Sequence, residues 1–273
     1  MPRPTNRVYP SLFALLMFAF LILFAGLAAA DSPLVTADND QGFPAVSGNI
    51  VVWEDYRNDS GDNSECDIYG YNLSTATEFS ICTASGLQTE PVVSGNIVVW
   101  SDERNDPGDF SECDIYGYNL STATEFSICT ASGWQFSPRI SGNIVVWVDE
   151  RNIATSGLDI YGYNLATSTE FPVCTAPDDQ WLGGVYGSII VWEDWRNFLT
   201  TGVDIYAYDL AAGQEFAVCT DADWQFTPDV YGNVIVWVDD RNYASRGDDI
   251  YGLELSTGLQ KIYCSETGNQ EYP

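Results

Sequence analysis

The chain has 273 residues, and its 39 acidic side chains against 10 lysines and arginines give a net charge of −29 at pH 7. Such an acidic surface repels phosphate backbones, so we expect no nucleic acid partner. The sequence contains no histidine, which excludes catalytic triads that depend on an imidazole and removes the commonest zinc ligand.

The first thirty residues are typical of a secretory signal peptide. Arg3 and Arg7 precede an apolar run from about Leu12 to Leu27, and three alanines at 28–30 supply the small residues needed for cleavage. We therefore expect an exported protein, either secreted or at the cell surface. The alternative is that the run stays as a membrane anchor, because it is nearly long enough to span a bilayer.

Residues 31–273 contain five repeats of 45 to 47 residues, at approximately 41–87, 88–134, 135–179, 180–224 and 225–269. Each repeat contains Trp-x-Asp-x-Arg-Asn, first as WEDYRN at 53–58, followed by Asp-Ile-Tyr and later by a cysteine. Residues 64–86 and 111–133 are identical. The repeated residues are Trp53, Asp55, Arg57 and Asp67; Trp100, Asp102, Arg104 and Asp114; Trp147, Asp149, Arg151 and Asp159; Trp192, Asp194, Arg196 and Asp204; and Trp237, Asp239, Arg241 and Asp249.

Within a repeat, four short strands are predicted in order. In the second repeat they are 91–94, 97–100, 114–120 and 125–130, and Gly95-Asn96 forms a turn between the first two. No segment has helical periodicity, and apolar runs such as Ile97–Trp100 indicate a sheet covered on both faces. Four strands repeated every 45 residues or so predict a five-bladed β-propeller, all-β in class.

The repeats resemble those of TolB-type propellers, and more closely those of archaeal and bacterial cell-surface propeller proteins. The resemblance rests on Gly-Asn-x-Val-Val-Trp-x-Asp-x-Arg-Asn followed by Asp-Ile-Tyr-x-Tyr, and it covers residues 41–273. It implies a propeller fold. The chain departs from periplasmic TolB in two ways, because it has no α/β domain before the propeller and carries Ser-Gly-Asn at 47–49 in place of the Ser-Pro-Asp-Gly turn.

A residue that recurs in every repeat is expected to support the blade, since a catalytic site is normally singular. We predict that Arg57 pairs with Asp67 across a hairpin, that Asp55 or Asn58 holds the loop, and that this recurs in each blade. The tryptophans are expected to pack between blades. The alternatives are five active sites and a row of tryptophans that binds sugar.

The cysteines and two acidic loops have both structural and functional interpretations. Folding the hairpin near residues 74–76 brings Cys66 close to Cys82, and the same fold brings Cys113 close to Cys129, so disulfides are predicted for these pairs. The alternative is that the repeated cysteines are small buried hydrophobic residues. The loops 58–67 and 105–114 are rich in Asp and could bind calcium, although an ordinary solvated loop is the simpler interpretation and no cofactor is expected.

Function is expected where the repeats differ. The connection into each first strand keeps a glutamine, and its neighbours vary. In a propeller this connection opens onto one face, so the residues form a candidate binding rim for a sugar or a peptide. The alternative is that the rings fill blade junctions. The rim residues are Gln88, Trp134, Gln135, Phe136, Gln180, Trp181, Trp224, Gln225 and Phe226.

Three classes of function follow. The favoured one is a non-catalytic secreted or cell-surface module that binds protein or glycan, with no catalytic residues. The second is a glycoside hydrolase, which would need inward-pointing acids found in single blades; Asp229 is the best such acid. The third is a structural spacer of the cell envelope. The tail 264–273 matches the start of a sixth repeat, so in a closed ring it would compete with residues 36–44 for one position.

Overall fold

Strands make up nearly all of the regular structure in the computed structural model, which describes residues 33–62, 64–106 and 112–270. The one helix among these residues is α2, the four-residue segment Tyr243–Arg246. The signal peptide predicted for residues 1–30 lies outside the described residues.

The strands form five four-stranded sheets, and each sheet, or blade, uses four consecutive strands. Blade 1 contains β1 (Gln41–Ser47), β2 (Ile50–Asp55), β3 (Asp67–Asn72) and β4 (Thr77–Cys82). Blade 2 contains β5 (Gln88–Ser94), β6 (Ile97–Asp102), β7 (Asp114–Asn119) and β8 (Thr124–Cys129). Blade 3 contains β9 (Gln135–Ser141), β10 (Ile144–Asp149), β11 (Asp159–Asn164) and β12 (Thr169–Cys174). Blade 4 contains β13 (Gln180–Tyr186), β14 (Ile189–Asp194), β15 (Asp204–Asp209) and β16 (Gln214–Cys219). Blade 5 contains β17 (Gln225–Tyr231), β18 (Val234–Asp239), β19 (Asp249–Glu254) and β20 (Leu259–Cys264).

Each blade is an antiparallel meander with the same register. In blade 1, β2 pairs with β3 from Ile50 opposite Asn72 to Asp55 opposite Asp67. A two-residue turn joins β1 to β2, and Gly48 adopts a φ of 58° there, a conformation that glycine reaches without steric cost. The Trp-x-Asp segment therefore ends the second strand of every blade.

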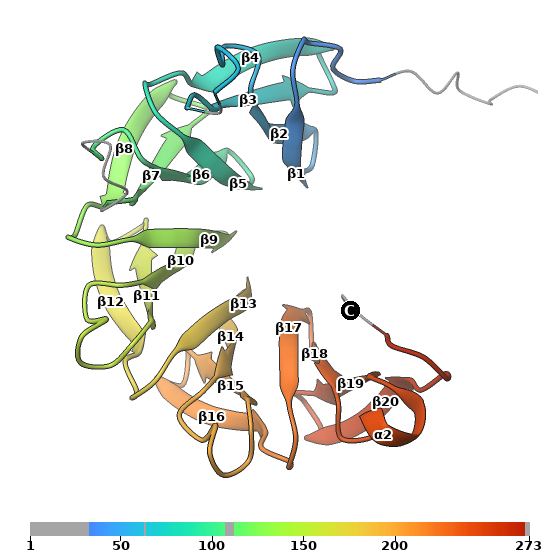
Figure 1. Ribbon diagram of the computed structural model, residues 1–273. Coiled ribbons are helices and arrows are strands. Elements are labelled where there is room, and N and C mark those ends of the chain that lie inside the picture. The colour runs from blue at the N-terminus through green and yellow to red at the C-terminus, as the bar shows by residue number, and fades with distance from the viewer. Residues whose placement is uncertain (1–32, 63, 107–111, 271–273) are drawn as a thin grey trace, which may run out of the picture. The chain divides into compact units, whose positions relative to one another are not determined.

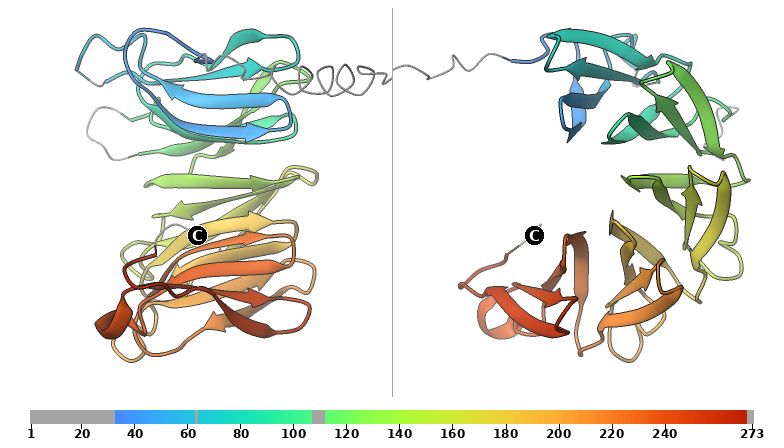
Figure 2. Two further views of the ribbon diagram at one scale, coloured as in Figure 1. Left: turned by 90° about the vertical axis from the view of Figure 1, so that its right-hand side faces the viewer. Right: turned by 180° about the vertical axis from the view of Figure 1, so that it is seen from behind.

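The blades follow one another in chain order along an arc, with the first strand of each on the inner side (Figure 1). The first strands of neighbouring blades lie against each other, as β1 does against β5 and β13 against β17. Figure 2 shows the same order from behind. The predicted all-β, five-bladed propeller is confirmed.

Buried apolar clusters join each blade to the next. Between blades 3 and 4, Val146 and Ile160 pack against Ile190 and Trp192, and all four are 0% exposed. Similar clusters join blade 1 to blade 2, blade 2 to blade 3 and blade 4 to blade 5. Each fully buried side chain of this size contributes about 1.5 to 3 kcal/mol, so the junctions are the main hydrophobic core.

In the described part of the chain, each of the two end blades has one face that no other blade covers (Figure 2). On blade 1, Val46 is 65% exposed and Leu73 is 46% exposed. On blade 5, Tyr263 of β20 is 53% exposed. The tail stays with blade 5, because the Gln270 backbone N–H donates to the carbonyl of Asp248.

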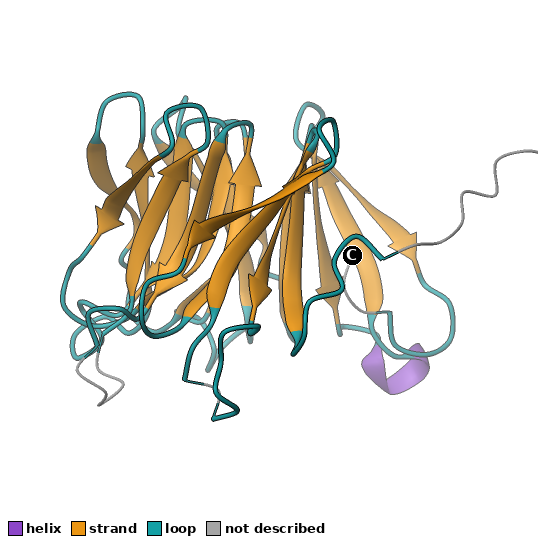
Figure 3. Cartoon of the chain, turned by 90° about the horizontal axis from the view of Figure 1, so that it is seen from above, coloured by secondary structure: helices purple, strands orange, loops and turns teal. Residues whose placement is uncertain are grey.

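The two ends of the sheets differ in their connections (Figure 3). Tight hairpins occupy one end. The other end, called the loop face here, carries the loops between the second and third strands of each blade and the connections from one blade to the next. The helix α2 lies there as part of the β18–β19 loop. Among the described residues, no helix is long and apolar enough to cross a membrane.

Candidate binding surface

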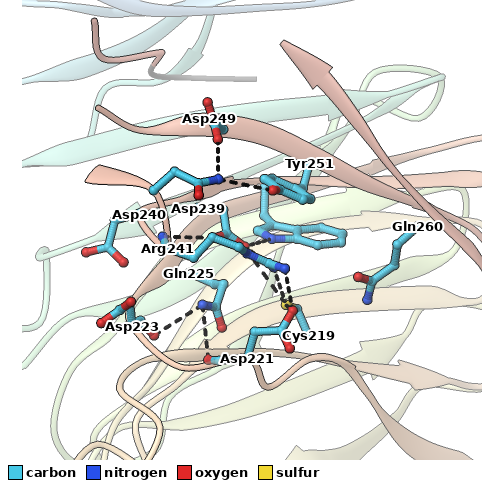
Figure 4. Close-up of polar contacts among 12 residues, drawn as sticks. Cys219, Asp221, Asp223, Gln225, Asp239, Asp240, Arg241, Asp249, Tyr251 and Gln260 are labelled. Atoms are coloured by element: carbon cyan, nitrogen blue, oxygen red, sulfur yellow. Dashed lines mark hydrogen bonds and ion pairs between the residues drawn. The ribbon is translucent and has the colours of Figure 1, made fainter. Parts of the chain in front are cut away.

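Each blade carries the same polar network at the end of its second strand. In blade 5, Trp237 Nε1 donates to Asp239 Oδ2 at 3.0 Å, and Arg241 Nε donates to Asp239 Oδ1 at 2.7 Å. The guanidinium carbon of Arg241 lies 4.2 Å from the centre of the Tyr251 ring (Figure 4). The other four blades have equivalent contacts. Because Asp239 is fully buried, these donors supply the hydrogen bonds that a buried carboxylate requires.

The five repeated tryptophans are between 0% and 4% exposed. Their rings are therefore out of reach of a sugar on the surface. Burial acts to raise the pKa of Asp55, but the hydrogen bonds from Arg57 and Trp53 outweigh it and hold that pKa below its usual value. The network thus keeps a buried charge ionised and belongs to the architecture of the blade.

The ion pair predicted between Arg57 and Asp67 is wrong. Arg57 pairs with Asp55 at 2.6 Å and with Glu78 of β4 at 2.5 Å. Asp67 accepts a hydrogen bond from Asn58 Nδ2 at 2.6 Å. The cause is the register, because Asp55 and Asp67 lie opposite each other, and the arginine binds the nearer carboxylate while Asn58 takes the second. The same exchange of partners occurs in the other four blades.

The arginines also contact the preceding blade. In four junctions, arginine Nη2 lies 3.0 to 3.2 Å from a cysteine Sγ, in the pairs Arg104–Cys82, Arg151–Cys129, Arg196–Cys174 and Arg241–Cys219. Figure 4 shows the last of these. Each repeated cysteine in these four pairs therefore lies at a blade junction, facing the arginine of the following blade.

The predicted disulfides Cys66–Cys82 and Cys113–Cys129 are not formed, since all seven cysteines are free thiols. The backbone of Cys66 forms an isolated parallel β-bridge with Leu87 in the connection to blade 2, and Cys113 forms the equivalent β-bridge with Trp134. Cys82 and Cys129 instead face arginines of the next blade. Burial raises the pKa of the Cys82 thiol to about 12, so the thiol stays protonated at neutral pH.

The glutamines of the predicted rim are buried. Gln88, Gln135, Gln180 and Gln225 are all 0% exposed. Their amides hold the connections between blades, as when Gln180 Nε2 donates to the carbonyl of Asp178 at 2.7 Å. The part of the rim prediction that gave these four amides contact with a ligand is therefore wrong.

The aromatic residues of the rim lie on the loop face in separate places. Phe136 packs edge-on against Trp181 with ring centres 6.0 Å apart, and Trp181 is 41% exposed. Trp224 is 45% exposed and lies 5.9 Å from the ring of Trp195. Phe226 is half-buried on β17. Two cavities accompany these rings.

The first cavity, the blade 3–4 cavity, has a volume of about 720 Å³. It lies between residues 153–157 of blade 3, residues 195–200 of blade 4 and the connection at 177–179. Ile153, Phe198 and Leu199 line it and are 53%, 40% and 95% exposed. Trp195 stacks on Phe198 with ring centres 5.0 Å apart.

Of residues 195–200, the sequence analysis named Arg196 and Asn197 as part of the repeated motif but not Trp195, Phe198, Leu199 or Thr200. A signal was present, because Trp195 stands in the fourth position of the repeated motif, where the other blades have Tyr56, Glu103, Glu150 and Asp240. This position varies between the repeats, as the residues around the repeated glutamines do.

The second cavity, the blade 1–3 cavity, has a volume of about 410 Å³. Four rings and four carboxylates line it, together with Thr89, Ser101 and Cys113. The rings are Phe43, Tyr56, Trp134 and Phe136, and the carboxylates belong to Glu54, Glu90, Glu103 and Glu150. Two of the predicted rim residues, Trp134 and Phe136, are thus brought together with acids that the sequence reasoning did not single out.

The glutamates of the blade 1–3 cavity are partly desolvated. Glu54 is only 3% exposed, and its Oε1 accepts a hydrogen bond from the backbone N–H of Glu90 at 2.6 Å. Glu90 in turn accepts the backbone N–H of Ser137 at 2.8 Å. Burial raises the pKa of Glu54, Glu103 and Glu150. These carboxyl groups therefore hold a proton more readily than exposed glutamates do.

The Asp-rich loop at 58–67 uses its acids to order its own backbone. Asp59 Oδ2 accepts the N–H of Gly61 at 2.7 Å, and Asp59 Oδ1 accepts the N–H of Ser64 at 3.0 Å. In the described part of the chain, no three or more acids and cysteines are grouped so as to hold a metal ion. Residues 107–111 of the loop at 105–114, the other candidate calcium loop, lie outside the described residues.

The fold has relatives among solved structures. TolB from Acinetobacter baumannii is 16% identical over 89% of this chain, with a TM-score of 0.57. The β-propeller domain of the Trilobed protease from Pyrococcus furiosus, described as having an open velcro topology, is 15% identical over 82% of this chain and 70% of its own, with a TM-score of 0.58. The chain has the fold of a TolB-like β-propeller.

The comparisons leave the activity of the propeller undecided. Puromycin hydrolase is 12% identical over 84% of this chain and 38% of its own, with a TM-score of 0.59. TolB-like propellers and proteins named as hydrolases are therefore both similar in fold. This chain spans 59% of the length of Acinetobacter TolB. No protein-family model matches the sequence, and no curated protein matches it.

Proposed function

We propose that the chain is an exported, non-catalytic binding module that recognises a protein partner through the blade 3–4 cavity and the apolar side chains around it. The observation that carries the proposal is the exposure of Leu199, which is 95% exposed at the tip of a loop beside Phe198 and Ile153. Contiguous exposed apolar side chains are typical of a surface that a partner covers.

The polar groups of these loops favour a protein over a glycan. Thr155 Oγ1 donates to the carbonyl of Asn152 at 3.0 Å, and Thr200 Oγ1 donates to the carbonyl of Asn197 at 2.9 Å. Hydroxyl groups that bond within their own loop are less able to bind sugar hydroxyls. The apolar side chains are what the loops present, and they suit the apolar residues of a protein interface.

The repeated acids give no support to a catalytic role, because each is bound in a structural network. Asp229, the acid predicted to serve best in a hydrolase, is exposed, and its Oδ1 accepts the N–H of the following residue, Val230, at 2.8 Å. A glycosidase needs a pair of carboxyl groups about 5 to 9 Å apart across the scissile bond, and Asp229 lines neither of the two cavities.

Site-directed photocrosslinking tests the proposal. A benzophenone amino acid at position 199 should capture a partner in the exporting cells, whereas the same group at Tyr231, which is 76% exposed in a hairpin at the opposite end of the sheets, should not. Leu199→Asp should abolish capture from a benzophenone at Ile153 without changing the melting temperature. Equal capture from positions 199 and 231, or turnover of chromogenic glycosides or peptides, would overturn the proposal.

A further inference from the structure

The blade 1–3 cavity joins carboxylates and aromatic rings with no basic side chain among the residues that line it. Its glutamates also lack basic partners elsewhere, because none of the ion pairs among the described residues involves Glu54, Glu90, Glu103 or Glu150. A carboxylate that is nearly removed from water without a cation is costly. The carboxylates of this cavity thus have no positive charge from the described residues to balance them.

Glu54 is the residue in which this is clearest. It is 97% buried by area, being 3% exposed, and it lines the cavity. Its Oε1 binds a backbone N–H of blade 2. Its Oε2 faces Gly42, where even a methyl group would lie only 3.6 Å from that oxygen. Because residue 42 is a glycine, no side chain from that position lies beside this oxygen.

The rings around the carboxylates supply the second element of a cation site. Phe43, Tyr56, Trp134 and Phe136 line the same cavity, and Phe43 is 65% exposed at its edge. The face of an aromatic ring attracts a cation within about 6 Å of its centre, and an ammonium group with alkyl substituents gains apolar contact there as well. A strongly hydrated metal ion gains little from such walls, since it requires oxygen ligands on most sides.

We propose that the blade 1–3 cavity binds an organic cation, an ammonium or guanidinium group held between Glu54, Glu90 and Glu103 and the rings of Tyr56, Trp134 and Phe136. The cation compensates the buried carboxylates, and the rings contact its carbon atoms. This site is separate from the blade 3–4 cavity, so it goes beyond the proposed protein-binding surface. Its failure in the test below would leave that surface unaffected.

The chain contains a matched control for Glu54. Glu193 occupies the same position of the motif in blade 4, where its Oε1 accepts the backbone N–H of Thr227 at 2.7 Å, just as Glu54 accepts that of Glu90. Glu193 does not line the blade 1–3 cavity. Glu54→Gln and Glu193→Gln therefore make the same structural change, and a glutamine oxygen can still accept the backbone hydrogen bond.

Isothermal titration calorimetry with paired probes tests the charge requirement. Choline and 3,3-dimethylbutan-1-ol have nearly the same shape but differ in charge, and so do acetyl-Gly-Arg-Gly-amide and the same peptide with citrulline in place of arginine. Titrations in about 0.5 M NaCl screen the diffuse attraction of a chain with a net charge of −29. The charged member of at least one pair should bind, and its neutral counterpart should not.

The outcomes separate the sources of the cation. Tighter binding of choline indicates a free small molecule, and tighter binding of the arginine peptide indicates a basic side chain of a protein. Glu54→Gln should lower the affinity for the probe that binds by at least about tenfold, whereas Glu193→Gln should leave that affinity unchanged. If Glu54→Gln fails to fold, Glu103→Gln takes its place. Equal loss in the Glu193 variant, equal binding of neutral probes, binding of calcium alone, or no binding at all would each overturn the proposal.

Discussion

Replacing Arg151 with methionine removes a guanidinium group that contacts two carboxylates and an aromatic ring of blade 3. Its Nε and Nη2 bind the two oxygens of Asp149 at 2.9 and 2.7 Å, its Nη1 binds Glu170 at 2.6 Å, and its guanidinium carbon lies 4.1 Å from the centre of the Tyr161 ring. Methionine keeps much of the apolar stem but leaves the fully buried carboxylate of Asp149 without a cation.

The size of the effect follows from what remains around Asp149. Breaking a buried ion pair from one side costs about 3 to 5 kcal/mol. The indole N–H of Trp147 and the backbone N–H of residue 151 still bind Asp149, at 2.8 and 2.9 Å, so we expect the low end, about 3 kcal/mol. For a domain of this size that lowers the melting temperature by about 6 to 12 °C.

Differential scanning calorimetry of Arg151→Met beside two controls checks this reasoning. Lys261→Met removes an exposed cation that lies 3.7 Å from Glu254, and such surface pairs contribute less than about 1 kcal/mol. Arg57→Met should fall between the two, because among the described residues no cysteine contacts Arg57 as Cys129 contacts Arg151. A melting temperature for Arg151→Met within about 2 °C of the unaltered protein would refute a structural role for the network, especially if binding were lost instead.

Three other predictions concern pH, thiols and the blade 3–4 cavity. Burial raises the pKa of Glu193 above its unfolded value, so its contribution to stability is present at low pH and lost as pH rises through the folded pKa. Glu193→Gln should therefore raise the melting temperature at pH 7 and lose this advantage below pH about 4, and a pH-independent difference would contradict it. Alkylation and mass spectrometry without reductant should find seven reactive thiols in the unfolded chain and slow reaction of Cys82 in the folded one. Fewer than seven thiols in the unfolded chain would support the disulfides predicted from the sequence. Gly157→Ala should cost about 1 to 3 kcal/mol, because φ is 90° there and the new methyl group would lie 2.6 Å from Asp179 Oδ1; calorimetry that finds no change would show that the loop adapts.

The architecture could be predicted from the sequence because it depends on local patterns that repeat. The spacing of Trp53 and its four counterparts identified the repeats, and alternation of apolar runs with turns such as Gly95-Asn96 identified four strands in each. Errors of a residue at a strand end do not change such a result. The fold therefore followed from pattern and period alone.

The contact partner of each side chain could not be predicted, because it depends on the direction in which the side chain points, and the sequence does not give that direction. Arg57 lies within reach of both Asp55 and Asp67, and only the register, which sets these two acids opposite each other, decides between them. Cys66 and Cys82 are near in the folded hairpin, yet one lies against the connection to blade 2 and the other faces Arg104 of that blade. In both predictions, the partner that was expected lies close to the residue, but another neighbour makes the contact.

The cavities could be located only from the three-dimensional structure, but several of the residues that line them occupy the variable positions of the repeated motif. In Trp-x-Asp-x-Arg-Asn, the tryptophan, the aspartate and the arginine share one side of the strand end, and the two variable positions alternate with them. The first variable position supplies Glu54 and Ser101 to the blade 1–3 cavity. The second supplies Tyr56, Glu103 and Glu150 to the same cavity and Trp195 to the blade 3–4 cavity.

The repeated and the variable positions of this short segment thus have different roles. The repeated side chains hold the blade end rigid through buried hydrogen bonds, and in blades 1 to 4 the second variable position supplies a side chain that lines a cavity. A change at a variable position can alter a cavity without breaking the network behind it. Exchanging Trp195 for the glutamate found at the same position in blades 2 and 3 should therefore leave the melting temperature nearly unchanged while removing partner capture at the blade 3–4 cavity. A large loss of stability in Trp195→Glu, measured by calorimetry, would show that the two sets of positions are not independent.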